Sequence, residues 1–163
     1  MGRRTLFTLL ATAFIVFFAS RALRTVDPER VAGETDWVAF GEAFEQAGEQ
    51  RKLLLIDIYE IGCRFCRAME REVYPSEPVQ ALIDRHFIPV RVDGRSDDLI
   101  QWQGQAVPMS AFALEMNVSA YPHTVIMSPD GRVLDDRRGY MDILAFSQWL
   151  RVTAAGWSGP SDG

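Results

Sequence analysis

The residues most able to do chemistry are Cys63 and Cys66, the only cysteines in a chain of 163 residues. Two thiols separated by two residues can form a disulfide and exchange it with a disulfide of another molecule. A scaffold held by several disulfides, or a zinc site of four cysteines, needs more cysteines than the chain contains. Three interpretations of the pair are open: a redox centre, an inert structural disulfide, and a Cu(I) site that Met69 helps to form.

The residues around the pair favour a thiolate on Cys63. A turn is expected at Glu60–Gly62 and a helix at or near Cys63. Unpaired backbone N–H groups and the helix dipole stabilise negative charge at a helix N-terminus. A cysteine in such a position has its pKa lowered from about 8.5 to between roughly 3.5 and 7.5. Cys66 is expected to lie one turn inside the helix, where it is shielded and suited to resolving a mixed disulfide.

The pair is expected where a buried strand ends and a helix begins. Leu53–Tyr59 is a short and almost continuous apolar run, which predicts a strand buried on both faces. Phe87–Asp93 predicts the next strand, and Pro89 favours an edge position for it. Asp36 is expected to cap a helix that ends before Lys52. The remaining predicted elements are helices over 63–73 and 79–85, a helix after Pro108, strands at 124–127 and 132–134, and a last helix after Gly139, while 94–105 is an unassigned polar stretch.

This order of elements predicts the fold class. A βαβ unit followed by a ββα unit gives an α/β fold with a central mixed sheet and helices on both of its faces. Open α/β sheets place their chemistry at the end of a strand, where the crossover helix starts. Cys63 and Cys66 occupy that position in the chain.

The sequence resembles the thioredoxin superfamily in several features besides the cysteine spacing. Asp57 lies six residues before Cys63, as a buried aspartate does in that family. Pro122 precedes a strand of the predicted hairpin, in the place of the family's cis-proline, and Gly139 precedes the last helix. The resemblance covers roughly residues 36–155 and implies a thioredoxin fold. The Cys-x-Phe-Cys-x-x-Met-Glu pattern from Cys63 looks closest to the exported subgroup that acts in periplasmic disulfide reduction.

The resemblance also implies roles for individual residues. Cys63 would be the attacking nucleophile, Cys66 the resolving thiol, and Asp57 the buried group that exchanges a proton with Cys66. Pro122 would hold the backbone of Tyr121 so that it pairs with an extended substrate segment. No metal and no cofactor are expected.

Trp102 is a candidate substrate contact for a separate reason. It lies in the stretch from Asp93 to Pro122, which is longer than in minimal thioredoxins. Extended loops beside a site often select its partner. The alternative is that Trp102 covers the core.

The N-terminal region predicts export. Residues 1–22 combine Arg3 and Arg4 with an apolar run over 5–20, which is typical of a signal peptide or a single-span membrane anchor. A linker is expected at 23–35, the thioredoxin-like domain at 36–156, and a flexible tail at 157–163. The net charge of -5 argues against a nucleic-acid partner, because binding to phosphates needs a basic face.

Taken together, these features predict an exported enzyme that reduces disulfides of other exported proteins through Cys63 and Cys66. Reduction in an oxidising compartment requires electrons from elsewhere, so a membrane electron-transfer partner is expected. Two alternatives are open. One is a disulfide oxidase or isomerase of the same fold, and the other is a non-enzymatic module that carries copper or docks partners.

Overall fold

The computed structural model describes residues 35–159. The predicted signal peptide or anchor at 1–22, nearly all of the predicted linker at 23–35, and the last four residues of the predicted tail lie outside the described residues. Within residues 35–159, no helix combines the length and the apolar character needed to cross a membrane.

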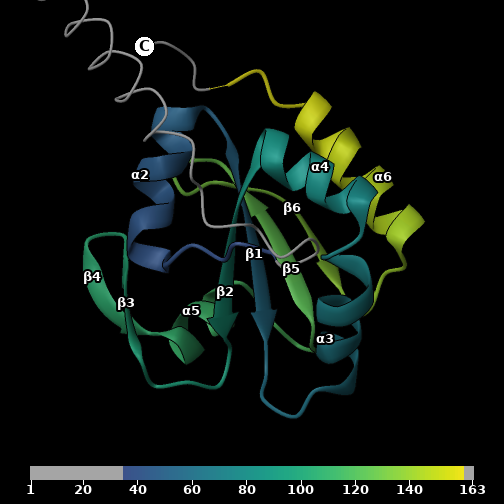
Figure 1. Cartoon of the computed structure of the whole chain (residues 1–163). Coiled ribbons are helices and arrows are strands. Elements are labelled where there is room, and N and C mark those ends of the chain that lie inside the picture. Colours follow the sequence, from purple (N-terminus) through teal and green to yellow (C-terminus); the bar gives the residue numbers. More distant parts are fainter. Residues whose placement is uncertain (1–34, 160–163) are drawn as a thin grey trace, which may run out of the picture. The chain divides into compact units, whose positions relative to one another are not determined.

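A four-stranded mixed sheet lies at the centre of the molecule (Figure 1). Its strand order is β2-β1-β5-β6, with β1 at Leu53–Tyr59, β2 at Phe87–Asp93, β5 at His123–Met127 and β6 at Val133–Arg138. β1 and β2 are parallel, whereas β5 is antiparallel to both β1 and β6. The sheet confirms the predicted α/β class, and β2 lies at an edge, as Pro89 predicts.

One face of the sheet is covered by two helices and a small hairpin. These elements are α2 (Phe40–Gln50), α5 (Met109–Glu115), β3 (Leu99–Trp102) and β4 (Gln105–Pro108). They pack against alternate residues of β1, namely Leu54, Ile56 and Ile58. This alternation follows from the strand geometry, because successive side chains point to opposite faces.

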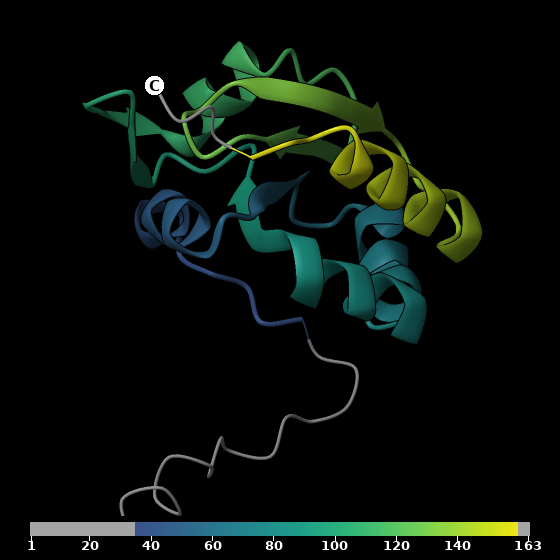
Figure 2. The ribbon, with the colours of Figure 1, turned by 90° about the horizontal axis from the view of Figure 1, so that it is seen from above.

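The other face is covered by helices that follow β1 and β6. They are α3 (Arg64–Ala68), the π-helical turn η1 (Met69–Val73), α4 (Glu77–His86) and α6 (Ile143–Ala155). α4 and α6 lie side by side, as Figures 1 and 2 both show. Leu53 and Leu55 point into this layer. Asp57 continues the same alternation, so its side chain faces α3 and η1.

The structure differs locally from the sequence prediction. The helix that Asp36 was expected to cap begins only at Phe40, because the backbone N–H of Val38 donates to the Pro89 carbonyl at 2.9 Å and keeps this segment extended beside β2. The polar stretch at 94–105 contributes β3 and the start of β4. The helix expected over 63–73 is divided into α3 and η1.

Candidate functional site

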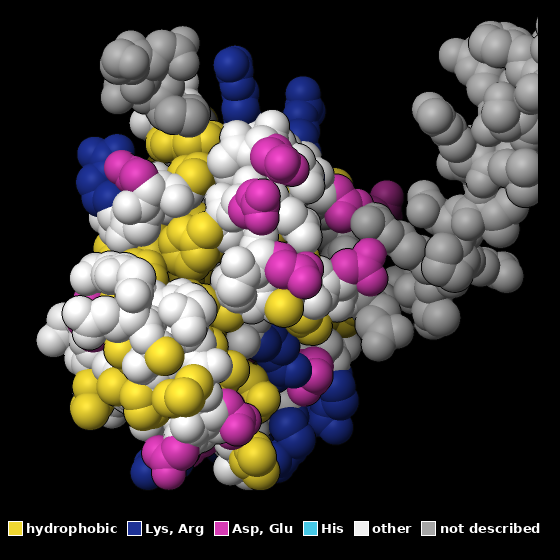
Figure 3. Space-filling model, turned by 90° about the vertical axis from the view of Figure 1, so that its left-hand side faces the viewer, with side chains coloured by type: hydrophobic (Ala, Val, Ile, Leu, Met, Phe, Trp, Pro, Cys, Tyr) yellow, Lys and Arg dark blue, Asp and Glu magenta, His cyan; other side chains and the backbone are white. Residues whose placement is uncertain are grey.

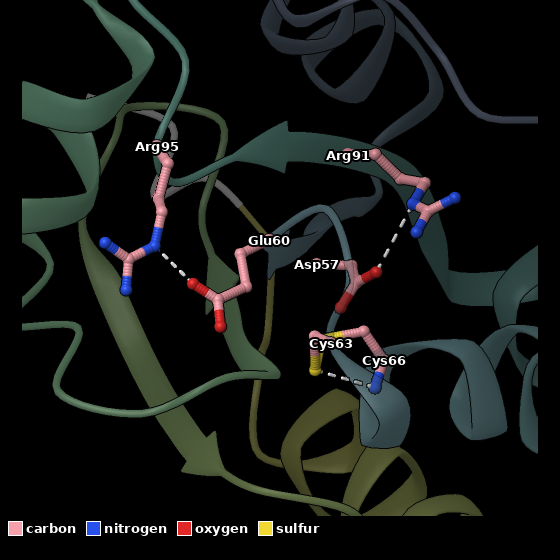
Figure 4. The surroundings of a disulfide bond; sticks show 6 residues. All are labelled: Asp57, Glu60, Cys63, Cys66, Arg91 and Arg95. Carbon is pink, nitrogen blue, oxygen red and sulfur yellow. Dashed lines mark hydrogen bonds and ion pairs between the residues drawn. A yellow bond between two sulfur atoms is a disulfide. The ribbon is translucent and has the colours of Figure 1, made fainter.

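Cys63 and Cys66 form a disulfide at the start of α3 (Figure 4). Cys63 is the N-cap residue, and its Sγ accepts a hydrogen bond from the backbone N–H of Cys66 at 3.0 Å. The first backbone N–H groups of a helix have no acceptor within the helix, and this bond gives one of them a sulfur acceptor. Cys63 is partly exposed, whereas Cys66 is 3% exposed. The sequence prediction that Cys63 lies at a helix start and that Cys66 is shielded is therefore confirmed.

Asp57 is a buried carboxyl on the face of β1 that α3 and η1 cover. Its side chain is 1% exposed, and Arg91 Nε lies 3.4 Å from Oδ2. Within residues 35–159, neither carboxyl oxygen has a hydrogen bond of good geometry. Burial raises the pKa of Asp57 from 3.8 to about 6, although Arg91 and the Tyr74 hydroxyl favour the charged form. Asp57 can therefore hold or release a proton near neutral pH.

Arg91 is a site residue that the sequence analysis missed. It lies opposite Asp57 in the parallel register of β1 and β2. Its guanidinium forms an ion pair with Glu70 of η1, with Nη1 and Oε1 2.7 Å apart, and lies 4.2 Å from the centroid of the Tyr59 ring. The sequence signal was a single cation inside the apolar strand Phe87–Asp93, where a buried partner is to be expected.

The segment of Pro122 lies next to the end of β1 that leads to Cys63, because His123 at the start of β5 pairs with Ile58. The peptide bond between Tyr121 and Pro122 is cis, and the Pro122 carbonyl accepts a hydrogen bond from the N–H of Gly139 at 2.7 Å. The hydroxyl of Tyr121 donates to the Gly94 carbonyl at 3.1 Å. The Tyr121 side chain therefore anchors its own segment to the end of β2.

The contact between Tyr121 and Gly94 requires a glycine. A Cβ atom added at Gly94 would lie 2.6 Å from the Tyr121 hydroxyl oxygen and 3.0 Å from Cγ2 of Ile58. We therefore expect Gly94→Ala to lower the free energy of unfolding by about 1–3 kcal/mol, as overpacking does. Urea unfolding of the oxidised protein measures this. The control is Gly48→Ala in α2, where a Cβ meets nothing within 4 Å and where alanine favours the helix. Equal effects of the two substitutions would contradict the argument.

Trp102 lies in the core and not at the disulfide. The residue is 6% exposed, its ring contacts the rings of Phe40, Phe44 and Phe112, and its Nε1 donates to Glu115 at 2.9 Å. Figure 3 views the side of the molecule that carries α2 and the β3–β4 hairpin, where hydrophobic and acidic side chains both reach the surface. Packing in this aromatic cluster fits the alternative role of covering the core.

The position of Trp102 along the sheet leads to the same conclusion. A Cβ atom at Gly131 would lie 3.3 Å from the Trp102 ring. Gly131 is in the turn that follows β5, and the end of β5 pairs with Leu54 at the start of β1. Cys63 follows the other end of β1, and a seven-residue strand is about 20 Å long. The structure does not bring Trp102 to the disulfide, and its place fits the alternative role of covering the core.

Exposed hydrophobic side chains lie close to the cysteine pair in the sequence. Ile61 is 84% exposed in the turn before Cys63, and Phe65 follows in α3. The Phe65 and Tyr140 rings are 6.5 Å apart, and both are exposed. Among residues 35–159, no three His, Cys, Asp or Glu side chains are grouped so as to hold a metal ion.

Comparison with known families agrees with this geometry. Residues 40–154 match the thioredoxin-like domain family, and the match includes both cysteines, Asp57 and Pro122. The chain belongs to the thioredoxin-like domain family. This confirms the resemblance to thioredoxins and the expected fold.

Solved structures with the same fold are distant in sequence. The DsbH oxidoreductase superposes with a TM-score of 0.58 at 16% identity, over 80% of this chain and 93% of its own. A thioredoxin from Thermus thermophilus superposes with a TM-score of 0.59 at 18% identity, over 73% of this chain and 86% of its own. The C-terminal domain of Neisseria meningitidis DsbD, in its oxidised form, superposes with a TM-score of 0.52 at 17% identity, over 68% of this chain and 88% of its own. At these identities the likeness establishes the fold.

The curated relatives are much longer proteins. An uncharacterized Caenorhabditis elegans protein is 23% identical over 131 residues, which are 75% of this chain and 17% of the relative. Human spermatogenesis-associated protein 20 is 32% identical over 59 residues, which are 36% of this chain and 8% of the relative. The chain thus spans less than a fifth of the length of either relative.

Proposed function

We propose that the chain is a thiol-disulfide oxidoreductase that reduces disulfides of exported proteins. One observation carries the proposal: a partly exposed Cys63 at a helix start is joined to a buried Cys66, on the side of β1 from which the buried Asp57 projects. A structural disulfide would need neither the exposure of one sulfur nor a carboxyl with a pKa of about 6 beside it.

The first step is attack by Cys63 in the reduced protein. Its thiolate forms a bond to one sulfur of the substrate disulfide, and the other substrate sulfur leaves as a thiolate that takes a proton from water. The N–H of Cys66, which contacts Cys63 Sγ in the oxidised structure, stabilises the attacking thiolate. The product of this step is a mixed disulfide between Cys63 and the substrate.

The second step releases the substrate. Asp57 in its carboxylate form accepts the proton of the Cys66 thiol, and the Cys66 sulfur then attacks Cys63 Sγ. The bond between Cys63 and the substrate breaks, and the second substrate sulfur leaves as a thiolate. Two electrons have moved from the protein to the substrate, and the protein is left with the Cys63–Cys66 disulfide that the structure contains.

The substrate is held in an extended conformation across the site. The backbone of Tyr121 pairs with a substrate strand, as in other complexes that form by strand addition. The exposed side chains of Ile61, Phe65 and Tyr140 supply an apolar surface for the residues that flank the substrate cystine.

Export and an electron-transfer partner in the membrane complete the proposal. The basic and apolar N-terminal sequence supports export. The reductase direction is supported by Asp57, whose carboxylate assists the step that releases reduced substrate. The C-terminal domain of Neisseria meningitidis DsbD has this fold in both an oxidised and a reduced form. A membrane dithiol that reduces the Cys63–Cys66 disulfide would return the protein to its active state.

The redox potential of the cysteine pair tests the direction. We expect equilibration with glutathione to give a potential of about -270 mV, in the range of reducing thioredoxins, and we expect the reduced protein to reduce the disulfides of insulin. A potential of about -120 mV would identify an oxidase instead. A protein whose purified form binds stoichiometric copper and reduces no disulfide would be a carrier.

A further inference from the structure

Arg95 contacts the residue that begins the turn of Cys63. Its Nε forms an ion pair with the carboxylate of Glu60, as Figure 4 shows. The backbone carbonyl of Glu60 accepts a hydrogen bond from the N–H of Cys63 at 3.2 Å. The same residue therefore holds Cys63 through its backbone and is held by Arg95 through its side chain.

Arg95 also contacts the residue that precedes the cis-proline. Its guanidinium lies 5.8 Å from the centroid of the Tyr121 ring, within the range of a cation–π contact. The backbone carbonyl of the neighbouring Gly94 accepts a hydrogen bond from the Tyr121 hydroxyl. Gly94 is also held to β1, because its N–H donates to the Tyr59 carbonyl at 2.8 Å. Two segments that are distant in the sequence thus meet at a single arginine.

We propose that Arg95 is a positioning residue for thiol-disulfide exchange, because it sets the separation between the turn of Cys63 and the segment of cis-Pro122 through Glu60 and Tyr121. The inference rests on the proposed function, in which a substrate touches both segments at once. One sulfur of the substrate disulfide must reach Cys63 Sγ while the substrate backbone pairs with residue 121. A change in their separation therefore weakens the binding of an extended substrate before it affects the chemistry of the sulfur.

The contribution of Arg95 to the stability of the fold is small. Its side chain is 73% exposed, and that of Glu60 is 27% exposed. Ion pairs with this degree of exposure contribute little to stability, because water screens them. A loss of function in an Arg95 variant with an unchanged melting temperature would therefore report on positioning.

A set of four variants tests the proposal with insulin as the disulfide substrate. We expect Arg95→Met to raise KM about tenfold and to change kcat less than about twofold. Glu60→Gln removes the same ion pair from its other end, and the double variant should be no worse than either single variant, because the two residues act as one unit. Arg95→Lys keeps the charge and should recover part of the loss. Arg151→Met, on the exposed side of α6, is the control for the loss of an arginine.

Hydrogen exchange of two backbone amides gives a readout that does not depend on activity. The Cys63 amide reports on the turn, and the Gly139 amide, which donates to Pro122, reports on the proline segment. We expect both to exchange about threefold faster in Arg95→Met than in the parent or in Arg151→Met, an effect of the size that an exposed ion pair can produce. Unchanged exchange with unchanged KM, or strictly additive effects of the two single substitutions, would overturn the positioning role. If the parent protein reduces no insulin, the proposed function fails, and the two amides still decide whether Arg95 positions these segments.

Discussion

Replacing Cys63 with serine is expected to lower the rate of disulfide reduction at least about a thousandfold, because a serine hydroxyl is not ionised at neutral pH and cannot form a disulfide. Replacing Cys66 with serine has a different consequence. Cys63 can still attack, but no second sulfur releases the substrate. The Cys66→Ser protein should therefore accumulate as a covalent adduct with its substrate, which mass spectrometry detects under non-reducing conditions and which a reductant dissolves.

A comparison of these variants distinguishes the role of the Cys63 sulfur from that of the Cys66 sulfur. The double variant, with serine at both positions, should form no adduct, because the attacking sulfur is absent. Turnover that survives in Cys63→Ser, or an adduct that forms equally well in the double variant, would show that the reactive group lies elsewhere. In cells, the adducts of Cys66→Ser would also identify the natural substrates.

The sequence predicted the parts of the site that depend on local spacing. The distance of six residues from Asp57 to Cys63 corresponds to one strand end and one turn, so the two residues stay close in any fold that contains them. The proline at 122 could be identified because it directly precedes the apolar strand β5. Both residues were identified by matching short stretches of this kind to the pattern of the thioredoxin superfamily.

Contacts between strands could not be predicted in the same way. Arg91 meets Asp57 only because β1 and β2 pair in a particular register, and hydrophobic runs buried on both faces leave that register undetermined. Arg95 meets Glu60 for a similar reason, since both follow the ends of those two strands. Contacts of this kind can be identified only when the pairing register of the strands is known.

The β3–β4 hairpin was missed because its pattern is short and mixed. Only Ile100 and Trp102 of β3 are buried, in alternation with exposed residues. The turn consists of Gln103 and Gly104, both with positive φ. Such turns favour Asn-Gly or Asp-Gly, so glutamine in the first place weakened the signal. Two apolar residues in a polar stretch are therefore enough for an edge hairpin that packs on a core.

Replacing Asp57 with asparagine is expected to stabilise the oxidised protein above pH 6 and not below pH 4. The pKa of Asp57 is about 6 in the folded protein and near 3.8 in the unfolded chain. Between these values the folded protein holds the extra proton, so the stability of the parent falls as the pH rises through this window. At pH values above this window, the stability of the parent carries the full free-energy cost of burying the carboxylate, which is about 3 kcal/mol for a shift of about two pKa units. Asparagine carries no such cost.

The measurement is urea unfolding of the parent and of Asp57→Asn between pH 4 and pH 8. The difference in free energy of unfolding should grow by about 2.5 kcal/mol between pH 4 and pH 8. Other titrating groups, including His123, are common to both proteins and cancel in this difference. Asp97→Asn, which removes an exposed carboxylate, is the matched control. A difference that stays flat with pH would contradict the raised pKa of Asp57.

The same substitution should reduce activity while it increases stability. Without a carboxylate at position 57, the Cys66 thiol loses its proton acceptor, and the release of substrate from Cys63 should slow about a hundredfold at pH 7. Single-turnover measurements of mixed-disulfide decay would isolate that step. A carboxyl with a purely structural role would give the opposite pattern, with stability lost and the decay rate unchanged. A gain in stability together with a slower decay would therefore identify Asp57 as a buried charge that the fold tolerates because the reaction uses it.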